Sequence, residues 1–214
     1  MIARLVVDAA QDGAAEAGWT AGVLLSLTGL AWREGDAAAP GDGPVVFAGA
    51  AERAPADAAV ILPWIDPGPW LPAGLALADC EGVPVPCAGG RLSAPSDARA
   101  FPAEWLRAVF SLLSREEERL ETARDQWECF AGTQSRLHAL GVLERPLVNQ
   151  YAALLARRLE AWADARQGTI VPLPLWPNGK RYAALLSHDV DEVRFGSLVE
   201  AALRHDDTAA RELV

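Results

Sequence analysis

The sequence predicts an α/β protein: a layered N-terminal domain with a mostly parallel sheet and long helices, followed by the beginning of a second domain. Short apolar runs bounded by Gly, Pro or Asp are typical of buried parallel strands, and they occur at residues 4–7, 44–47 and 58–62. Apolar residues at helical spacing lie between and after these runs. An extended, proline-punctuated stretch then begins at Thr169. We therefore expect one domain over residues 1–168 and another over 169–214.

The first helix is expected over residues 20–32, because Val23, Leu24, Leu27 and Leu30 repeat at helical spacing. Thr20 is its expected N-cap. Residues 34–44 read as a loop by composition.

The middle of the chain is expected to be helical. One helix begins near Pro102 and places Leu106, Val109, Phe110 and Leu113 on one face. Residues 114–117 have capping-box spacing, which predicts a second helix or a kink in the first. The acidic run 116–118 could be a solvated surface or could bind a cation; we expect the solvated surface.

The longest helix is expected over residues 146–166. Its apolar stripe comprises Leu147, Tyr151, Leu154, Leu155, Leu159 and Trp162. Pro146 suits the first helical position, and Gly168 is the expected C-cap.

Residues 63–74 combine four prolines with Trp64 and Trp70. These tryptophans could stack on sugar rings, or they could pin the loop onto the core. We expect the second arrangement. The glycines at 41, 43, 89 and 90 suit turns, and they do not form a phosphate-binding loop between a strand and a helix.

The bulk composition narrows the partners and the compartment. The 214 residues carry a net charge of −10, which argues against nucleic acid or an anionic membrane surface as a partner. No segment is long and apolar enough to span a bilayer, and the N-terminus lacks the pattern of a signal peptide. Cys80, Cys87 and Cys129 are odd in number and irregularly spaced, so we expect buried free thiols and a cytoplasmic protein. The sequence does not specify the oligomeric state.

The chemistry is expected at the end of an apolar run. Residues 182–187 read as a buried strand that stops at Ser-His-Asp-Val-Asp (187–191). Because side chains alternate along a strand, Asp189 and Asp191 can project to the same side. Burying charge there is costly unless the charge is used. One carboxylate could bind a divalent metal while the other serves as a general base toward a metal-bound water.

The segment PLWPNGKRYAALLSHDVDEV, residues 174–193, resembles the entry to a polysaccharide-deacetylase (NodB-homology) domain. One branch of that family begins with a W-P-x-G-K turn, a buried strand and T/S-H-D-V-D. The preceding region resembles the N-terminal domain of unknown function of that branch. Residues 110–117 are similar to its S-x-x-L-S-R-x-E-E helix, and residues 141–149 to its G-x-L-x-R-P-x-V-[ND] turn.

The resemblance implies a (β/α) barrel that hydrolyses acetyl groups from carbohydrate with a divalent cation, often zinc. It places Asp189 at the position of the catalytic base and Asp191 at that of the metal-ligand aspartate. His188 has no ligand role in that pattern.

The chain departs from the family pattern downstream. The family supplies a His-x-x-x-His pair, whereas this chain has only His138, His188 and His205, none four residues from another. Residues 205–207 could form a makeshift metal site, but we expect a polar loop there. We therefore expect the N-terminal portion of such a hydrolase, truncated and inactive by itself. The alternative is a non-catalytic, glycan-binding accessory α/β module.

Overall fold

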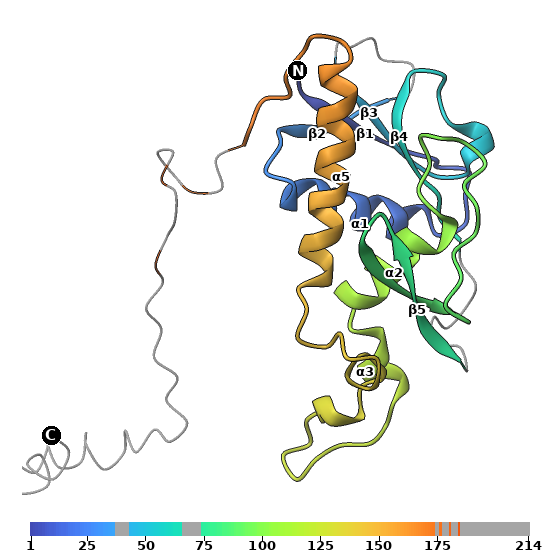
Figure 1. Ribbon diagram of the computed structural model, residues 1–214, viewed down its shortest axis with the longest axis vertical. Coiled ribbons are helices and arrows are strands. Elements are labelled where there is room, and N and C mark those ends of the chain that lie inside the picture. The colour runs from blue at the N-terminus through green and yellow to red at the C-terminus, as the bar shows by residue number, and fades with distance from the viewer. Residues whose placement is uncertain (37–42, 66–73, 174–175, 177–179, 181–183, 185–214) are drawn as a thin grey trace, which may run out of the picture. The chain divides into compact units, whose positions relative to one another are not determined.

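The computed structural model describes residues 1–36, 43–65 and 74–173, together with the single residues 176, 180 and 184 (Figure 1). Chain contacts divide the protein into two units, Met1–Pro174 and Leu175–Val214. All the described helices and strands belong to the first unit. The strand expected at 182–187, and with it the start of a barrel, lies outside the described residues.

The first unit is built on a four-stranded parallel sheet with strand order β2-β1-β3-β4. The strands are β1 (Ala3–Val7), β2 (Trp32–Glu34), β3 (Val45–Ala48) and β4 (Ala58–Leu62). The expected α/β class with a mostly parallel sheet is confirmed, as are the three apolar strands. The edge strand β2 falls where a helix end and a loop were predicted, so that prediction was wrong.

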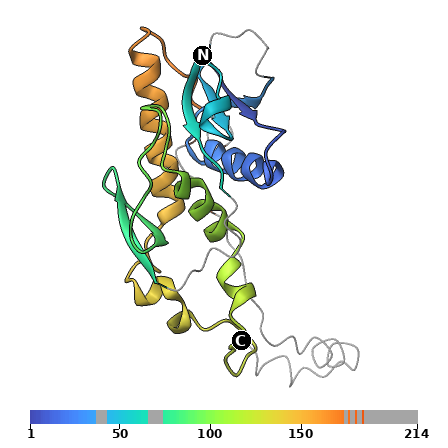
Figure 2. The same cartoon turned by 90° about the vertical axis from the view of Figure 1, so that its right-hand side faces the viewer.

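Three helices cover one face of this sheet: α1 (Ala14–Leu27), α2 (Ala103–Leu113) and α5 (Leu147–Asp164) (Figures 1 and 2). Alternate strand residues such as Leu5, Val46 and Leu62 join the helices in the larger apolar core. At its centre the ring of Trp105 stacks on Phe101 with centroids 4.1 Å apart. The predicted stripe of the long helix therefore faces this core.

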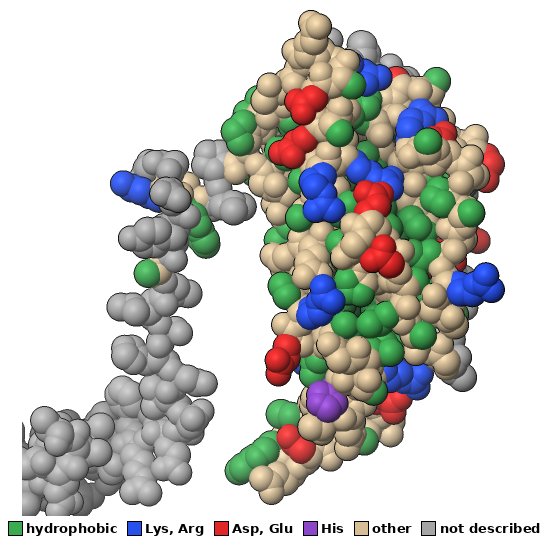
Figure 3. All heavy atoms as spheres, in the orientation of Figure 1, with side chains coloured by type: hydrophobic (Ala, Val, Ile, Leu, Met, Phe, Trp, Pro, Cys, Tyr) green, Lys and Arg blue, Asp and Glu red, His purple; other side chains and the backbone are tan. Residues whose placement is uncertain are grey.

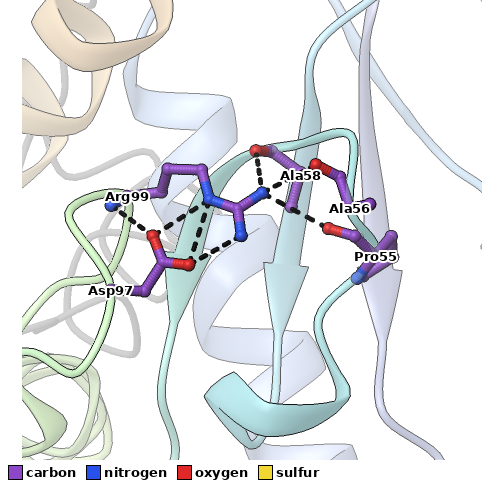
Figure 4. A network of polar contacts seen from close by, with 5 residues as sticks. All are labelled: Pro55, Ala56, Ala58, Asp97 and Arg99. Carbon is purple, nitrogen blue, oxygen red and sulfur yellow. Dashed lines mark hydrogen bonds and ion pairs between the residues drawn. The ribbon is translucent and has the colours of Figure 1, made fainter.

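The opposite face of the sheet carries a smaller core, whose buried members are Val6, Val45, Phe47, Ala58, Ile61 and Ala100. Irregular chain covers this face. Arg99 ties the covering segment down, because its guanidinium donates to the carbonyl oxygens of Ala56 and Ala58 and to the Asp97 carboxylate (Figure 4). Hydrogen bonds from an arginine thus hold the covering chain on this face, whereas packed helices cover the other face.

Helix α1 begins at Ala14, earlier than the predicted start, and Thr20 lies within it. The Thr20 hydroxyl donates to the Glu16 carbonyl oxygen at 2.6 Å instead of capping the helix. Gly13 occupies the N-cap position with φ of 76°, and no side chain caps the helix there. The prediction of Thr20 as the cap was wrong because alanine-rich residues 14–17 extend the helix.

An antiparallel hairpin of β5 (Leu75–Cys80) and β6 (Val83–Ala88) was not predicted. The Tyr151 hydroxyl of α5 donates to the Pro84 carbonyl oxygen at 2.7 Å and so fastens the hairpin to the helix. Cys80 and Cys87 are buried free thiols, as expected, and burial raises the pKa of both. Cys129 is exposed, so the expectation was wrong for it.

The acidic run lies in α3 (Glu116–Leu120) and is not a solvated surface. Glu116 is buried in a paired contact with the Arg107 guanidinium, two N–O distances of 2.8 Å. Glu117 accepts from the Ser135 hydroxyl and from the Arg136 amide, which begins α4 (Arg136–Ala139). Arg115, in the left-handed conformation, precedes α3, so Ser114 does not form the predicted capping box. The run therefore connects α2 to α4. Two 3-10 turns, η1 (Ala51–Arg53) and η2 (Gly132–Gln134), complete the described elements.

The end of α5 and the chain after it stay attached to the first unit. Gln167 adopts a positive φ of 55°, and the amide of Gly168 bonds the Ala163 carbonyl oxygen. Gly168 was therefore the wrong residue for the left-handed position, although it does close the helix. The extended conformation predicted after Thr169 is present over residues 169–173, where Val171 and Leu173 bond the backbone of Met1 and Gly29.

Candidate functional site

The two predicted site residues, Asp189 and Asp191, lie outside the described residues, as do His188, His205 and Trp70. Among the residues that the structure does describe, no group of three or more His, Cys, Asp or Glu side chains is placed to hold a metal ion. The described chain also contains no helix with the length and apolarity to cross a membrane.

The sheet topology places a crevice elsewhere, at the carboxyl ends of β1 and β3. After β1 the chain passes through α1 to β2 on one side, whereas β3 pairs with the other side of β1. The loops after β1 and β3 therefore leave in opposite directions. In open parallel sheets such a switch point is the usual place for a ligand.

Asp8 is the first residue after β1, and its side chain is largely buried. Its carboxylate accepts from the amide of Ala10 at 3.2 Å and from Nε of Arg53 at 2.5 Å. Arg53 comes from η1, which follows β3, and half of its side chain is exposed. The pair links the two loops that flank the switch point.

Two glycines allow the backbone to pack closely against side chains of the crevice. A Cβ atom on Gly49 would lie 2.3 Å from Cβ of Asp8. A Cβ atom on Gly13 would lie 2.3 Å from Nε1 of Trp64, which follows β4. Larger residues would therefore displace Asp8 or the indole.

Trp64 is buried, with 7% of its surface exposed, and its ring meets Phe110 edge-on at 5.5 Å. Its carbonyl oxygen accepts from Nε2 of Gln11 at 2.9 Å. The expectation that Trp64 pins its loop onto the core is confirmed. Its face is consequently unavailable for stacking on a sugar ring.

Two adjoining cavities open along this edge of the sheet, and Trp64 lines both. The first, which we call the polar cavity, measures about 450 Å³ and is lined by Ala10, Gln11, Asp12, Arg53 and Trp64. The second, which we call the mixed cavity, measures about 290 Å³. Its walls combine polar and apolar side chains, among them Glu52, Pro63, Ile65, Pro95 and Ser96.

The chemistry of the crevice suits binding. Arg53 supplies donors, whereas Asp12 and Glu52 supply acceptors, so charges of both signs meet within a short span. The described lining residues include neither Cys nor His. Acidic and basic side chains are also interspersed over the face of the first unit shown in Figure 3.

The sequence contains one local signal for this crevice. Asp8 directly follows the apolar run at 4–7, and Asp189 follows the apolar run at 182–187 after one histidine. An acidic residue at the end of an apolar run is therefore the sequence signal for Asp8. Arg53 carries no comparable local signal, because only the sheet order brings it to Asp8.

Comparison with known protein families gives a match to part of the chain. The profile of a family described as "Family of unknown function (DUF7033)" matches residues 72–163, from just before the β5–β6 hairpin to near the end of α5. That span includes the hairpin and helices α2 to α4, and it excludes the parallel sheet. No curated protein and no solved structure shows a significant match to the chain.

Proposed function

We propose that the chain is the N-terminal portion of a polysaccharide-deacetylase-like, metal-dependent hydrolase that removes acetyl groups from carbohydrate. The observation that carries the proposal is the Ser-His-Asp-Val-Asp sequence at 187–191, behind an apolar run and a Trp-Pro-Asn-Gly-Lys turn. The first unit would be an accessory module of that hydrolase.

Two further observations support the assignment of an accessory module. The proposed catalytic residues follow Pro174, outside the first unit, whereas the described residues contain no group of three or more His, Cys, Asp or Glu side chains placed to hold a metal ion. The family match, over residues 72–163, ends before the apolar run and the acidic sequence at 187–191, so it covers a different part of the chain from the proposed catalytic residues.

In the proposed enzyme Asp189 acts as the general base and Asp191 as a metal ligand. A bound divalent cation, zinc by resemblance, would supply a polarised water. Catalytic zinc usually has three protein ligands, and Asp191 would be only one of them. The 214 residues alone are therefore expected to be inactive.

The test is acetate release from N-acetylglucosamine oligomers with added zinc. The 214-residue chain should release none, whereas the chain extended through the downstream reading frame should be active. In the extended protein Asp189→Asn should lower kcat by about 10²–10⁴-fold, the usual contribution of a general base. The matched control is Asp164→Asn, at the exposed end of α5, which should leave kcat unchanged. Zinc-dependent turnover by the 214 residues alone would contradict the proposal.

The second candidate is a non-catalytic module that binds glycan. In the sequence, the tryptophans at 64 and 70 favour this candidate, but Trp64 is buried and cannot stack on a sugar ring. The observation that favours it now is the crevice beside Trp64.

A further inference from the structure

We propose that the crevice at the carboxyl edge of the sheet binds an uncharged oligosaccharide, with one sugar unit in the polar cavity and a neighbouring unit in the mixed cavity. The location rests on the geometry of the crevice. The choice of carbohydrate also rests on the proposed function.

The charge of the crevice excludes highly charged ligands. Among the described residues that line the two cavities, Arg53 is the one basic side chain, and its charge is already balanced by Asp8. Asp12 and Glu52 add negative charge, and the whole chain carries −10. A polyanion would be repelled. A divalent cation lacks the set of ligands it needs among the described residues.

The hydrogen-bonding groups match hydroxyl groups, each of which can donate and accept. The carboxylates of Asp12 and Glu52 can accept from a sugar. The terminal nitrogens of Arg53 can donate to one, because the bond of Arg53 to Asp8 uses Nε. The exposed hydroxyl of Ser96 in the mixed cavity can do either.

The apolar groups are placed for the C–H faces of a sugar ring. Pro63, Ile65 and Pro95 line the mixed cavity beside the polar groups. A sugar needs such alternation because its rim is polar and its faces are apolar. Trp64 contributes as the wall common to both cavities and is too buried to act as a stacking platform.

The crevice is largely pre-formed, which lowers the cost of binding. The Asp8–Arg53 pair fixes the β1 and β3 loops, and the Gln11–Trp64 bond fixes the β4 loop. On the far side of the mixed cavity, the Glu104 carboxylate holds the amide and hydroxyl of Ser93.

The experiment is a titration of the isotopically labelled 214-residue chain with β-1,4-linked tetramers of N-acetylglucosamine and of glucose, followed by amide chemical shifts. At least one tetramer should shift the amides of residues 10–13, 50–53 and 63–65. Asp12→Ala should weaken that binding by about tenfold, as expected for one hydrogen bond to a charged group. Arg53→Ala should weaken it at least as much.

Asp164→Ala is the matched control, since Asp164 is exposed at the end of α5, and it should bind like the parent chain. Asp12 is also exposed and has no side-chain partner among the described residues, so its variant should fold normally. The proposal is overturned if neither tetramer binds, if Asp12→Ala and Asp164→Ala bind equally well, or if inorganic phosphate produces the same shifts more strongly. Binding is read without turnover, so a negative result leaves the deacetylase proposal to its own assay.

Discussion

The two faces of the parallel sheet are stabilised differently. The face under α1, α2 and α5 buries a continuous core with Trp105, Tyr151 and Phe101 at its centre. The face under the irregular chain buries six of the described residues and depends on arginines. Arg99 bonds carbonyl oxygens at the start of β4, and the buried Arg4 reaches Asp57 at 3.7 Å.

The difference follows from what can cover a sheet. A helix satisfies its own backbone groups and presents a closely packed apolar stripe. Irregular chain leaves carbonyl oxygens unpaired, and buried ones need donors. A guanidinium supplies several donors from one side chain, which is why arginine appears on the loop-covered face. The helix-covered face should therefore lose stability when volume is removed, and the loop-covered face when a guanidinium is removed.

The largest effect is expected for Trp105→Ala on the helix-covered face. Trp105 is fully buried between Phe101 and Tyr151, so its removal leaves a cavity that fixed helices cannot fill. We expect a loss of about 3–5 kcal/mol in the free energy of unfolding, measured by chemical denaturation. Trp127→Ala, at a side chain that is 75% exposed, is the control and should cost less than about 0.5 kcal/mol.

The sharpest comparison uses two neighbours in β3. Val46 is buried on the helix-covered face and Val45 on the loop-covered face, and both are almost fully buried. Val46→Ala should cost about 2–3 kcal/mol and Val45→Ala about 1–2 kcal/mol, because irregular chain can relax into the space. Equal losses in denaturation experiments would show that the two faces are equally rigid.

The next effect is expected for Arg99→Ala. The variant leaves the carbonyl oxygens of Ala56 and Ala58 without their donor, which should cost about 1–2 kcal/mol. Hydrogen exchange should speed up first at the Ile61 amide, which bonds the Arg99 carbonyl oxygen. Arg33→Ala, on the exposed edge strand β2, should change neither quantity. If the exchange rate at the Ile61 amide is unchanged in the Arg99 variant, the guanidinium does not stabilise this face.

The same contrast explains what the sequence could predict. Strands β1, β3 and β4 are recognisable because both of their faces are buried, which makes them continuous apolar runs. Strand β2 escapes because Trp32, Arg33 and Glu34 lie at an exposed edge. The β5–β6 hairpin escapes because Pro84 and Pro86 resemble loop residues, although its two-stranded ladder tolerates them.

Of the two residues that pair at the candidate site, the sequence could predict one and not the other. Asp8 follows a recognisable strand, but its partner Arg53 is 45 residues away and is brought close only by the order β1-β3. Likewise the run 116–118 looked like solvated surface, because no local pattern shows that Arg107 turns its guanidinium toward Glu116. Long-range polar partners depend on topology, which local periodicity does not encode.

The smallest effect expected is a pH dependence confined to the loop-covered face. Hydrogen bonds from Arg99 lower the pKa of Asp97 to about 2, below its ordinary value of 3.8. A carboxylate whose pKa is lowered on folding stabilises the protein above its unfolded pKa, and that stabilisation is lost as the pH falls toward the folded pKa. The Asp97–Arg99 pair should therefore lose its contribution between about pH 4 and pH 2. Because Asp97 is at the surface, the contribution should be small and should shrink further in salt. The measurement is the difference in unfolding free energy between the parent chain and Asp97→Asn, followed through that range. A difference that stays constant from pH 5 to pH 2 would mean that Arg99 holds this face through the carbonyl oxygens alone.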